Sequence, residues 1–399
     1  MTQRQLFLRH LAPTSDIPLM LEIACAEGVY LYDTEGRKIL DLISGIGVSS
    51  LGHRHPAVEN AVRDQLGKYW HTMVYGEFVL TPQVQLARLL CEHLPAQLDS
   101  VYFVNSGTEA TEGAMKLAKR ATGRPEIIAA RQAYHGSTQG AASLMWPTDF
   151  TQAYHPLLPG IRHINFNDEN DLEKINGQTA AVILEVIQAE AGVKTPQNQY
   201  FKKLRRRCDE VGALLVLDEV QTGFGRTGSL FAFENQDIVP DVLLLAKGMG
   251  GGMPIGAFVA SRALMQHFAH HPPLGHITTF GGHPVSCAAG LATLQTLLAG
   301  DYISKVKTKE ALFKRQLAHP LVKEIRSAGL LMAVEIGAFD LVLKAVRMCL
   351  DRGLLIDWFL FDNCSLRIAP PLIISESEIE SACAILRSVF DKLYHSKSS

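Results

Sequence analysis

ALLVLDEVQTGFGRTG (213–228) and PDVLLLAKGMGGGMPIGAF (240–258) are the segments that decide the fold. In each, a short run of branched apolar residues ends in a charged residue, Asp218 in the first and Lys247 in the second. Strands buried on both faces have this composition, which is typical of a parallel sheet covered by helices. In such sheets ligands bind beyond the carboxyl ends of the strands. We therefore expect Asp218 and Lys247 to reach one crevice from neighbouring strands.

Similar apolar runs recur along the chain, and helix-like stretches separate them. The runs are SVYFVN (100–105), EIIAA (126–130) and AAVILEV (180–186), and the helical stretches are 56–70, 81–94, 111–121, 199–212 and 283–300. This alternation predicts an α/β fold with a mainly parallel sheet flanked by helices.

The two ends of the chain have a different pattern. GVYLYDTEGRKILDLIS (28–44) predicts a hairpin, and GLLMAVEIG (329–337) and LLIDWFLF (354–361) predict strands among the last hundred residues. We expect residues 1–48 to form an N-terminal arm that belongs to a smaller α+β domain. Residues 49–290 would form the large domain, and residues 291–399 the rest of the small one.

Composition excludes several classes of function. Of 399 residues, 47% are hydrophobic and 20% are charged, and the net charge of −2 gives no reason to expect nucleic acid or an anionic membrane as partner. No stretch approaches the roughly 20 apolar residues that span a bilayer, and the N-terminus lacks a secretory pattern, so we expect a cytoplasmic protein. The seven cysteines are dispersed and no H-E-x-x-H occurs, so we expect no metal site.

Asp218 and Lys247 together suit an aldehyde cofactor with a pyridine ring. An apolar setting disfavours the charged form of a lysine and leaves its amine nucleophilic. The amine can form a Schiff base, while a carboxylate keeps the pyridine nitrogen protonated so that the ring accepts electrons. Taken alone, Lys247 is explained better as a strand-end lysine paired with a surface acid.

A second candidate element is SVYFVNSGTEATEGAMKLAKRA (100–121), in which a strand runs directly into a helix. Ser106 and Glu109 have the spacing of a capping box. The free N–H groups and the dipole at a helix start favour a phosphate, although a plain capped helix explains this segment better when it is considered alone. In QAYHGSTQG (132–140), Tyr134 can stack on a flat ring.

A competing motif is G-x-G-x-x-G at residues 223–228, the dinucleotide fingerprint. The preceding strand ends at Asp218, too early for this motif, and the following residues are too broken for the required helix. We therefore disfavour a nicotinamide-dependent oxidoreductase.

The order of these motifs resembles the class III aminotransferases of pyridoxal-phosphate (PLP) fold type I, which include acetylornithine, ornithine and 4-aminobutyrate aminotransferases. The resemblance runs from LDLISGIGVSSLGHRHP (40–56) to LRIAPPL (366–372). It implies a PLP-dependent ω-aminotransferase that moves an amino group from a terminal amine to 2-oxoglutarate, giving glutamate and an aldehyde. A mutase or decarboxylase of the same fold is the alternative.

The resemblance also implies roles for individual residues. Lys247 would be the Schiff-base lysine, and Asp218 the partner of the pyridine nitrogen. The other cofactor-binding residues would be Ser106, Gly107 and Thr108 at the phosphate, Tyr134, His135 and Glu185 near the ring, Val220 beneath it, and Gln221 at its phenolic oxygen. In HITTFGGHP (276–284), Thr279 would reach the phosphate of the other subunit and Thr278 would lie near the substrate. A homodimer with shared active sites follows.

In the same family, Glu190 of EVIQAEAG (185–192) would pair with Arg367 as a gate. The closed pair neutralises the arginine for an amine donor, and the open pair frees it for the carboxylate of 2-oxoglutarate. A guanidinium can bind either carboxylate with the same two donors. A permanent buried ion pair is the alternative.

Two positions depart from the family pattern. Ser137 stands where relatives have an arginine that holds the donor's carboxylate, and Ile46 stands where ornithine-using relatives have a tyrosine. The donor would then be held differently or lack a carboxylate at that distance. Glu77, in VYGEF (74–78), would meet a second amine and favour a diamine or diamino acid, although an ordinary surface carboxylate fits Glu77 at least as well.

Overall fold

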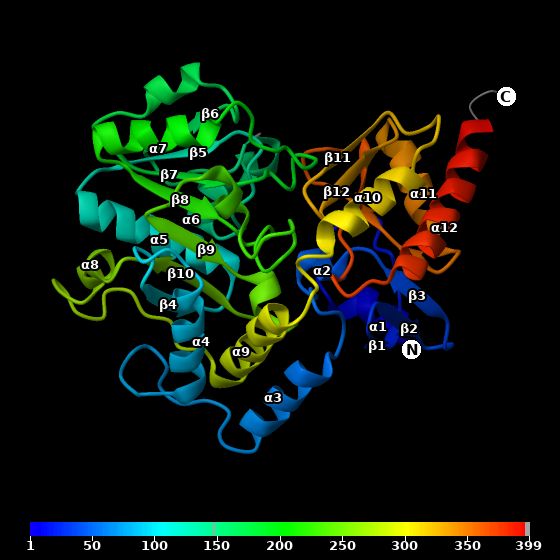
Figure 1. The fold of residues 1–399 in the computed structure, drawn as a ribbon, viewed down its shortest axis with the longest axis horizontal. Helices are drawn as coiled ribbons and strands as arrows, with labels where there is room; N and C mark the ends of the chain where they lie inside the picture. Colours follow the sequence, from blue (N-terminus) through cyan, green and yellow to red (C-terminus); the bar gives the residue numbers. More distant parts are fainter. Residues whose placement is uncertain (147, 396–399) are drawn as a thin grey trace.

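The computed structural model describes residues 1–146 and 148–395. One half of the molecule is built around a seven-stranded sheet, and the other half contains two four-stranded sheets (Figure 1). The central sheet has the order β4 (Ser100–Val104), β10 (Gly256–Ala260), β9 (Val242–Leu245), β8 (Leu214–Asp218), β7 (Thr179–Glu185), β5 (Glu126–Ala130) and β6 (Ile161–Ile164).

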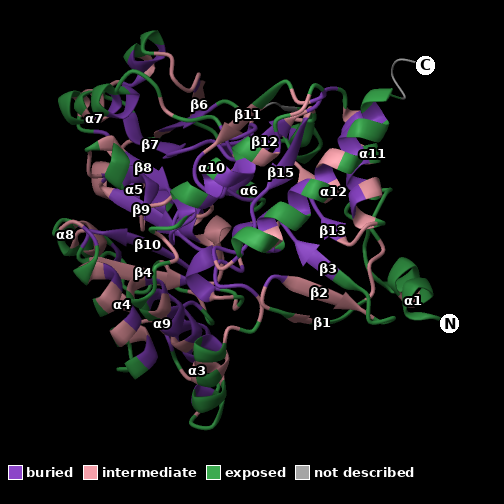
Figure 2. Ribbon diagram, turned by 45° about the vertical axis from the view of Figure 1, so that its right-hand side comes forward, coloured by how far each residue is buried: buried purple, intermediate pink, exposed green. Residues whose placement is uncertain are grey.

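Parallel pairing dominates this sheet, as predicted. The pairs β9–β8, β8–β7, β7–β5 and β5–β6 are parallel, whereas β10 runs antiparallel to both β4 and β9. Every residue of β7, β9 and β10 is buried, because helices cover both faces of the sheet (Figure 2).

The helices of this half follow the predicted stretches. α5 (Gly107–Thr122) packs across β10, β9 and β7, and α7 (Tyr200–Val211) packs on β8. α9 (Pro284–Ala299) packs against α3 (Pro56–Leu66) and α4 (Thr81–Glu92) below the sheet (Figure 1).

In the other half, the two chain ends share a sheet. Its strands are β1 (Ile23–Glu27), β2 (Tyr30–Asp33), β3 (Lys38–Asp41) and β13 (Leu354–Leu355), and β13 pairs parallel with β3. The β2–β3 hairpin is the one predicted. The second sheet has the order β11 (Glu324–Ser327), β12 (Met332–Glu335), β15 (Ser365–Ile368) and β14 (Asp357–Trp358).

Helix α11 (Phe339–Leu350) packs on β13 and β15, and α12 (Glu376–His395) packs against both α11 and α10 (Val306–Gln316). α1 (Gln3–His10) has no buried residue (Figure 2). The remaining short helices are α2 (Ser44–Gly47), α6 (Gln139–Ser143), α8 (Arg262–Met265), η1 (Thr148–Phe150), η2 (Gln152–Tyr154), η3 (Asn170–Lys174), η4 (Ala232–Gln236), η5 (Lys247–Gly250) and η6 (Gln266–Phe268).

The glycine-rich segment 223–228 forms turns, and only the short 3-10 helix η4 follows it. A dinucleotide site needs a long helix at that point. None of the described helices has both the length and the apolar character needed to cross a membrane. Across residues 1–146 and 148–395, no group of three or more His, Cys, Asp and Glu side chains could hold a metal ion.

Gly113 sets how closely α5 approaches the sheet. A Cβ at this position would lie 2.3 Å from the ring of Phe258 in β10. That ring cannot move easily, because it is fully buried and stacked on Tyr102 with ring centroids 4.9 Å apart.

We expect Gly113→Ala to lower the free energy of unfolding by about 1–3 kcal/mol through overpacking, even though alanine favours a helix over glycine. Chemical denaturation measures this change. Gly177→Ala, at a site with no atom within 4 Å of the new Cβ, is the control and should be close to neutral. A Gly113→Ala protein as stable as the parent would contradict the close packing of α5 on β10.

Candidate active site

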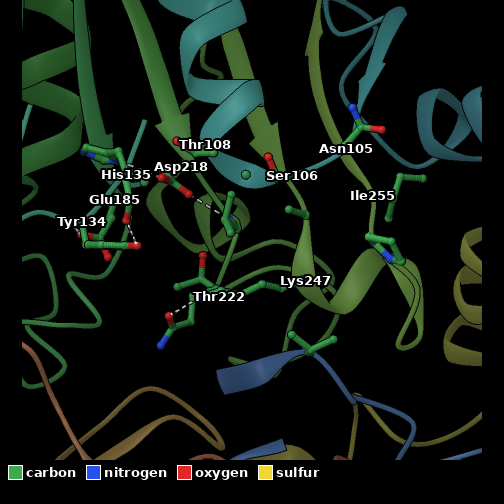
Figure 3. A pocket seen from close by; sticks show the side chains of 18 of the residues that line it. Asn105, Ser106, Thr108, Tyr134, His135, Glu185, Asp218, Thr222, Lys247 and Ile255 are labelled. Atoms are coloured by element: carbon green, nitrogen blue, oxygen red, sulfur yellow. Dashed lines mark hydrogen bonds and ion pairs between the residues drawn. The ribbon is translucent and has the colours of Figure 1, made fainter. Parts of the chain in front are cut away.

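A cavity of about 470 Å³ lies at the carboxyl ends of the central strands (Figure 3). The predicted residues that line it are Ser106, Gly107, Thr108, Tyr134, His135, Ser137, Glu185, Glu190, Asp218, Val220, Gln221 and Lys247. In the view of Figure 3, Tyr134, His135 and Glu185 are drawn on one side of the cavity and Asn105 and Ser106 on the other. Segments from five parts of the chain therefore converge on one space.

Lys247 and Asp218 come from adjacent strands, as predicted. β8 and β9 pair in parallel with Asp218 opposite Leu244, and Lys247 follows β9 at the start of η5. The Lys247 Nζ donates a hydrogen bond to Gln221 Oε1 at 2.6 Å. Burial lowers the pKa of the Lys247 amine, and the neighbouring carboxylates, Glu190 first, oppose only part of that effect.

Asp218 is a buried carboxylate with two partners, and only 5% of it is exposed. Its Oδ1 accepts a hydrogen bond from the Val220 N–H at 2.9 Å, and its Oδ2 lies 2.7 Å from His135 Nδ1. Burial favours the neutral form of His135, but the hydrogen bond and charge of Asp218 outweigh it and raise the pKa of His135. The raised pKa favours the form of His135 that donates to Asp218.

Glu185 ends β7 and supports the aromatic loop. Its carboxylate accepts hydrogen bonds from the Tyr134 N–H at 3.0 Å and the Ala189 N–H at 2.9 Å. Burial raises the pKa of Glu185 to about 7, with His135 acting in the opposite direction. The carboxyl group therefore fixes the position of Tyr134 through its backbone.

The start of α5 differs in detail from the predicted capping box. Ser106 is the N-cap, and its Oγ accepts a hydrogen bond from the Glu109 N–H at 3.3 Å. The Glu109 carboxylate, however, binds the N–H and Nδ2 of Asn105, at 2.7 and 2.8 Å, one residue before the cap. Among the described residues, the N–H groups of Gly107 and Thr108 have no acceptor, which leaves two donors for an anion.

A chain of hydrogen bonds ties the aromatic loop to this helix start. The Thr108 and Thr138 hydroxyls lie 2.7 Å apart, and Thr138 donates to Glu112 Oε1 at 2.7 Å. A Cβ at Gly136 would lie 2.2 Å from Thr108 Oγ1, so only glycine allows this approach. No motif in the sequence had singled out Glu112 or Thr138.

These groups fit pyridoxal phosphate. The free donors at the start of α5 suit its phosphate, the buried Asp218 suits its pyridine nitrogen, and the Lys247 amine suits its aldehyde. Val220 packs against Gly107, where an added Cβ would lie 3.0 Å from Val220 Cγ1, and it forms an apolar wall for a flat ring. All four features belong to the same cavity.

Glu190 and Arg367 form a buried bidentate ion pair. Arg367 Nη1 donates to Glu190 Oε1 at 2.8 Å, and Nη2 donates to Oε2 at 3.0 Å. Glu190 lines the cavity and Arg367 lies behind it. The structure thus brings this predicted pair together in the closed arrangement.

The structure does not bring every predicted residue to this cavity. Ile46, Glu77, Thr278 and Thr279 do not line it; Ile46 and Thr278 are half-buried, and Glu77 and Thr279 are exposed. Ser137 is exposed at the cavity edge, where its Oγ lies 2.9 Å from the Tyr134 hydroxyl.

Several cavity residues had no predicted role: Val48, Asn105, Ile187, Thr222, Ala246, Met253, Pro254 and Ile255. Asn105 lay within a quoted motif and could have been found by its position at the strand end. The apolar residues carry no chemical signal, because a pocket wall and a core position use the same side chains.

Comparisons with known proteins agree with this geometry. The family model described as aminotransferase class III matches residues 11–390. The acetylornithine aminotransferase of Methanopyrus kandleri is 42% identical over 382 residues, which cover 94% of this chain and 95% of that protein.

Solved structures are also similar. The ornithine aminotransferase of Toxoplasma gondii ME49 has a TM-score of 0.91 and 27% identity, covering 99% of this chain and 97% of that one. The adenosylmethionine-8-amino-7-oxononanoate aminotransferase of Methanocaldococcus jannaschii has a TM-score of 0.91 and 27% identity, with 98% of each chain covered. These likenesses confirm the expected PLP fold type I. By sequence and by fold, this chain belongs to the class III aminotransferases.

Proposed function

We propose that the chain is an ω-aminotransferase that moves an amino group from a terminal amine to 2-oxoglutarate. Class III aminotransferases use pyridoxal phosphate. The observation that carries the proposal is the meeting of Lys247, Asp218 and the Glu190–Arg367 pair at one cavity. The first two residues suit amino-group chemistry, and the pair suits an exchange between two substrates of different charge.

Pyridoxal phosphate, when bound, supplies an aldehyde that takes up the amino group and a ring that accepts electrons. Asp218 holds a proton on the ring nitrogen, because its carboxylate is buried and oriented by His135 and by the Val220 N–H. The Lys247 amine, whose pKa is lowered by burial, can accept and return a proton at the substrate carbon. Gln221 holds the amine in place from the facing loop.

In the closed Glu190–Arg367 pair the guanidinium is neutralised behind the cavity wall, so its charge is not offered to a donor. Opening of the pair would present a guanidinium fork to a carboxylate of 2-oxoglutarate. The relatives are described as acetylornithine and ornithine aminotransferases, which supports a terminal amine as donor. Ser137, in place of an arginine, favours a donor that needs no cation at that point.

We further propose a homodimer whose subunits complete each other's sites. Thr279 is exposed and Thr278 is half-buried, and neither lines the cavity of its own chain. The same holds for Glu77, so a contact of its carboxylate with the donor would have to cross the subunit boundary. The domain division at residues 48/49 and 290/291 likewise remains a proposal.

Lys247→Ala should lose full turnovers, because no other amine among the described residues lines the cavity to join the cofactor and to move the proton. We expect a fall in kcat of at least about 10³-fold, of the order seen when a catalytic base is removed. Loss of the visible absorption that marks covalent attachment of the cofactor is the second readout. A Lys247→Ala protein that still completes rapid turnovers would rule out the proposed mechanism.

Arg367→Ala and Glu190→Gln should separate the two half-reactions. Removing the guanidinium should lower kcat/KM for 2-oxoglutarate by about 10²-fold, corresponding to roughly 2–3 kcal/mol for charge-assisted hydrogen bonds. Glu190→Gln should spare 2-oxoglutarate and penalise the amine donor, because the arginine is no longer neutralised. Single-turnover kinetics with each substrate measures both effects. Equal losses in both half-reactions would instead favour a permanent structural ion pair.

A screen of donors should show what Ser137 and Glu77 select. Ornithine, N-acetylornithine, lysine, putrescine and 4-aminobutyrate are compared by single-turnover loss of the cofactor's absorption. We expect Glu77→Gln to lower kcat/KM for diamines by about two- to fivefold, the scale of a solvent-accessible charge contact. Glu35→Gln, at another exposed carboxylate outside the helices and strands, is the control. An unchanged diamine preference in Glu77→Gln would remove Glu77 from the site.

A further inference from the structure

Arg367 has a second carboxylate beside it, that of the partly buried Asp357, which the gate described above does not use. β14 and β15 pair antiparallel with Asp357 directly opposite Arg367. Asp357 Oδ1 lies 3.1 Å from Arg367 Nε, and the side chain of Asp357 is only 17% exposed. The two groups are not aligned for a hydrogen bond, so the contact is chiefly a charge–charge one.

The remaining contacts of Arg367 come from the same short segment. Its Nη2 donates to the Trp358 carbonyl at 2.6 Å, and its guanidinium carbon lies 4.7 Å from the centre of the Phe359 ring. Residues 357–359 thus contact the arginine at Nε, at Nη2 and through the Phe359 ring. These contacts do not depend on where the Glu190 side chain lies.

Glu190 is held differently. Among the residues that the structure describes, its carboxylate accepts hydrogen bonds from Arg367 and, at 3.1 Å, from the Leu360 N–H alone, while its backbone carbonyl accepts from the Phe361 N–H. Its side chain can therefore leave by giving up the guanidinium and one further donor. If Arg367 had no other counter-ion, that departure would leave a bare buried cation, which is strongly unfavourable.

We propose that Asp357 is the standing counter-ion of Arg367: it keeps the guanidinium placed and charge-compensated while Glu190 gives way to a substrate carboxylate. Asp357 is thus a positioning residue that acts through Arg367. This inference rests on the proposed function, because it needs a carboxylate substrate at Arg367.

The balance of charges around Arg367 makes the pKa of Asp357 sensitive to what occupies the place of Glu190. With Glu190 in place, two carboxylates face one guanidinium, and burial together with Glu190 and Asp41 raises the pKa of Asp357 to about 7 despite Arg367. Asp41 faces Asp357 from β3 and is itself paired with His53 at 2.9 Å. A substrate carboxylate in the place of Glu190 would repel the ionised form of Asp357 in the same way.

This repulsion determines the direction in which dicarboxylate binding changes with pH. A bound dicarboxylate raises the pKa of Asp357 above its value in the ligand-free site, so binding takes up a proton there. Binding is then tightest below the ligand-free pKa, where Asp357 is neutral in both states. Binding weakens as the pH rises from the pKa of Asp357 in the ligand-free site to its pKa in the complex. The total loss of affinity is about tenfold for each unit between these two pKa values.

The test uses glutarate, a five-carbon dicarboxylate with no keto group to react, and the cofactor-loaded protein. Calorimetry gives its Kd from pH 6 to pH 8 in Glu190→Gln, where Glu190 no longer competes. We expect the Kd of Glu190→Gln to rise several-fold over this range with proton uptake on binding. At pH 8, the double variant Glu190→Gln/Asp357→Asn should bind glutarate more tightly than Glu190→Gln does. The Kd of the double variant should hardly change between pH 6 and pH 8.

Asp362→Asn in the same background is the matched control. Asp362 lies on the same connection but bonds Arg326 and Ser365 rather than Arg367, so the pH dependence should persist. An unchanged pH dependence in the Asp357→Asn protein would overturn the inference. If that protein does not fold, a flat pH profile in Glu190→Gln alone overturns it equally. Absence of glutarate binding at every pH would overturn the proposed acceptor site itself, and the inference with it.

Discussion

Parallel pairing of β8 with β9 is the constraint on which the rest of the site depends. It ends both strands at the same edge of the sheet, so that the carboxylate of Asp218 and the amine of Lys247 enter one cavity. Neither group is stable there by itself, because burial disfavours a charge without partners. His135 forms a hydrogen bond with Asp218, and the lowered pKa of Lys247 makes its neutral, reactive form accessible. The energetic cost of burial and the chemistry of the site thus have the same origin.

Much of this arrangement could be predicted from local patterns. Apolar runs ending in charged residues predicted β7, β8 and β9, and turn residues predicted the β2–β3 hairpin. The antiparallel strand β10 was missed because GAFVA (256–260) follows a glycine-rich turn and is too short to reveal its direction. The capping box was predicted from spacing alone, yet Glu109 binds Asn105 because that residue offers both a backbone and a side-chain donor.

Asp357 shows a different limit of prediction from the sequence. LLIDWFLF (354–361) predicted a strand, but the contact of Asp357 with Arg367 depends on the register between β14 and β15. A register is decided by tertiary packing and not by either strand's own residues. Glu112 and Thr138 were missed for the same reason, since hydrogen bonds join them across 26 positions of sequence. Thr279 and Glu77 raise a third limit, because the roles proposed for them need a second subunit, and in one chain both are ordinary exposed positions.

The pairing of β3 with β13 also affects the order in which the two halves of the molecule can fold during synthesis. Leu40 pairs with Leu354, so a strand made early in synthesis finds its neighbour only when most of the chain has left the ribosome. Until then β3 has an open edge that could pair wrongly, and contacts between such distant residues form slowly. The large sheet uses only strands between residues 100 and 260 and needs no such wait. Synthesis therefore favours a cofactor-binding half that forms first, with β15 and its Arg367 added last.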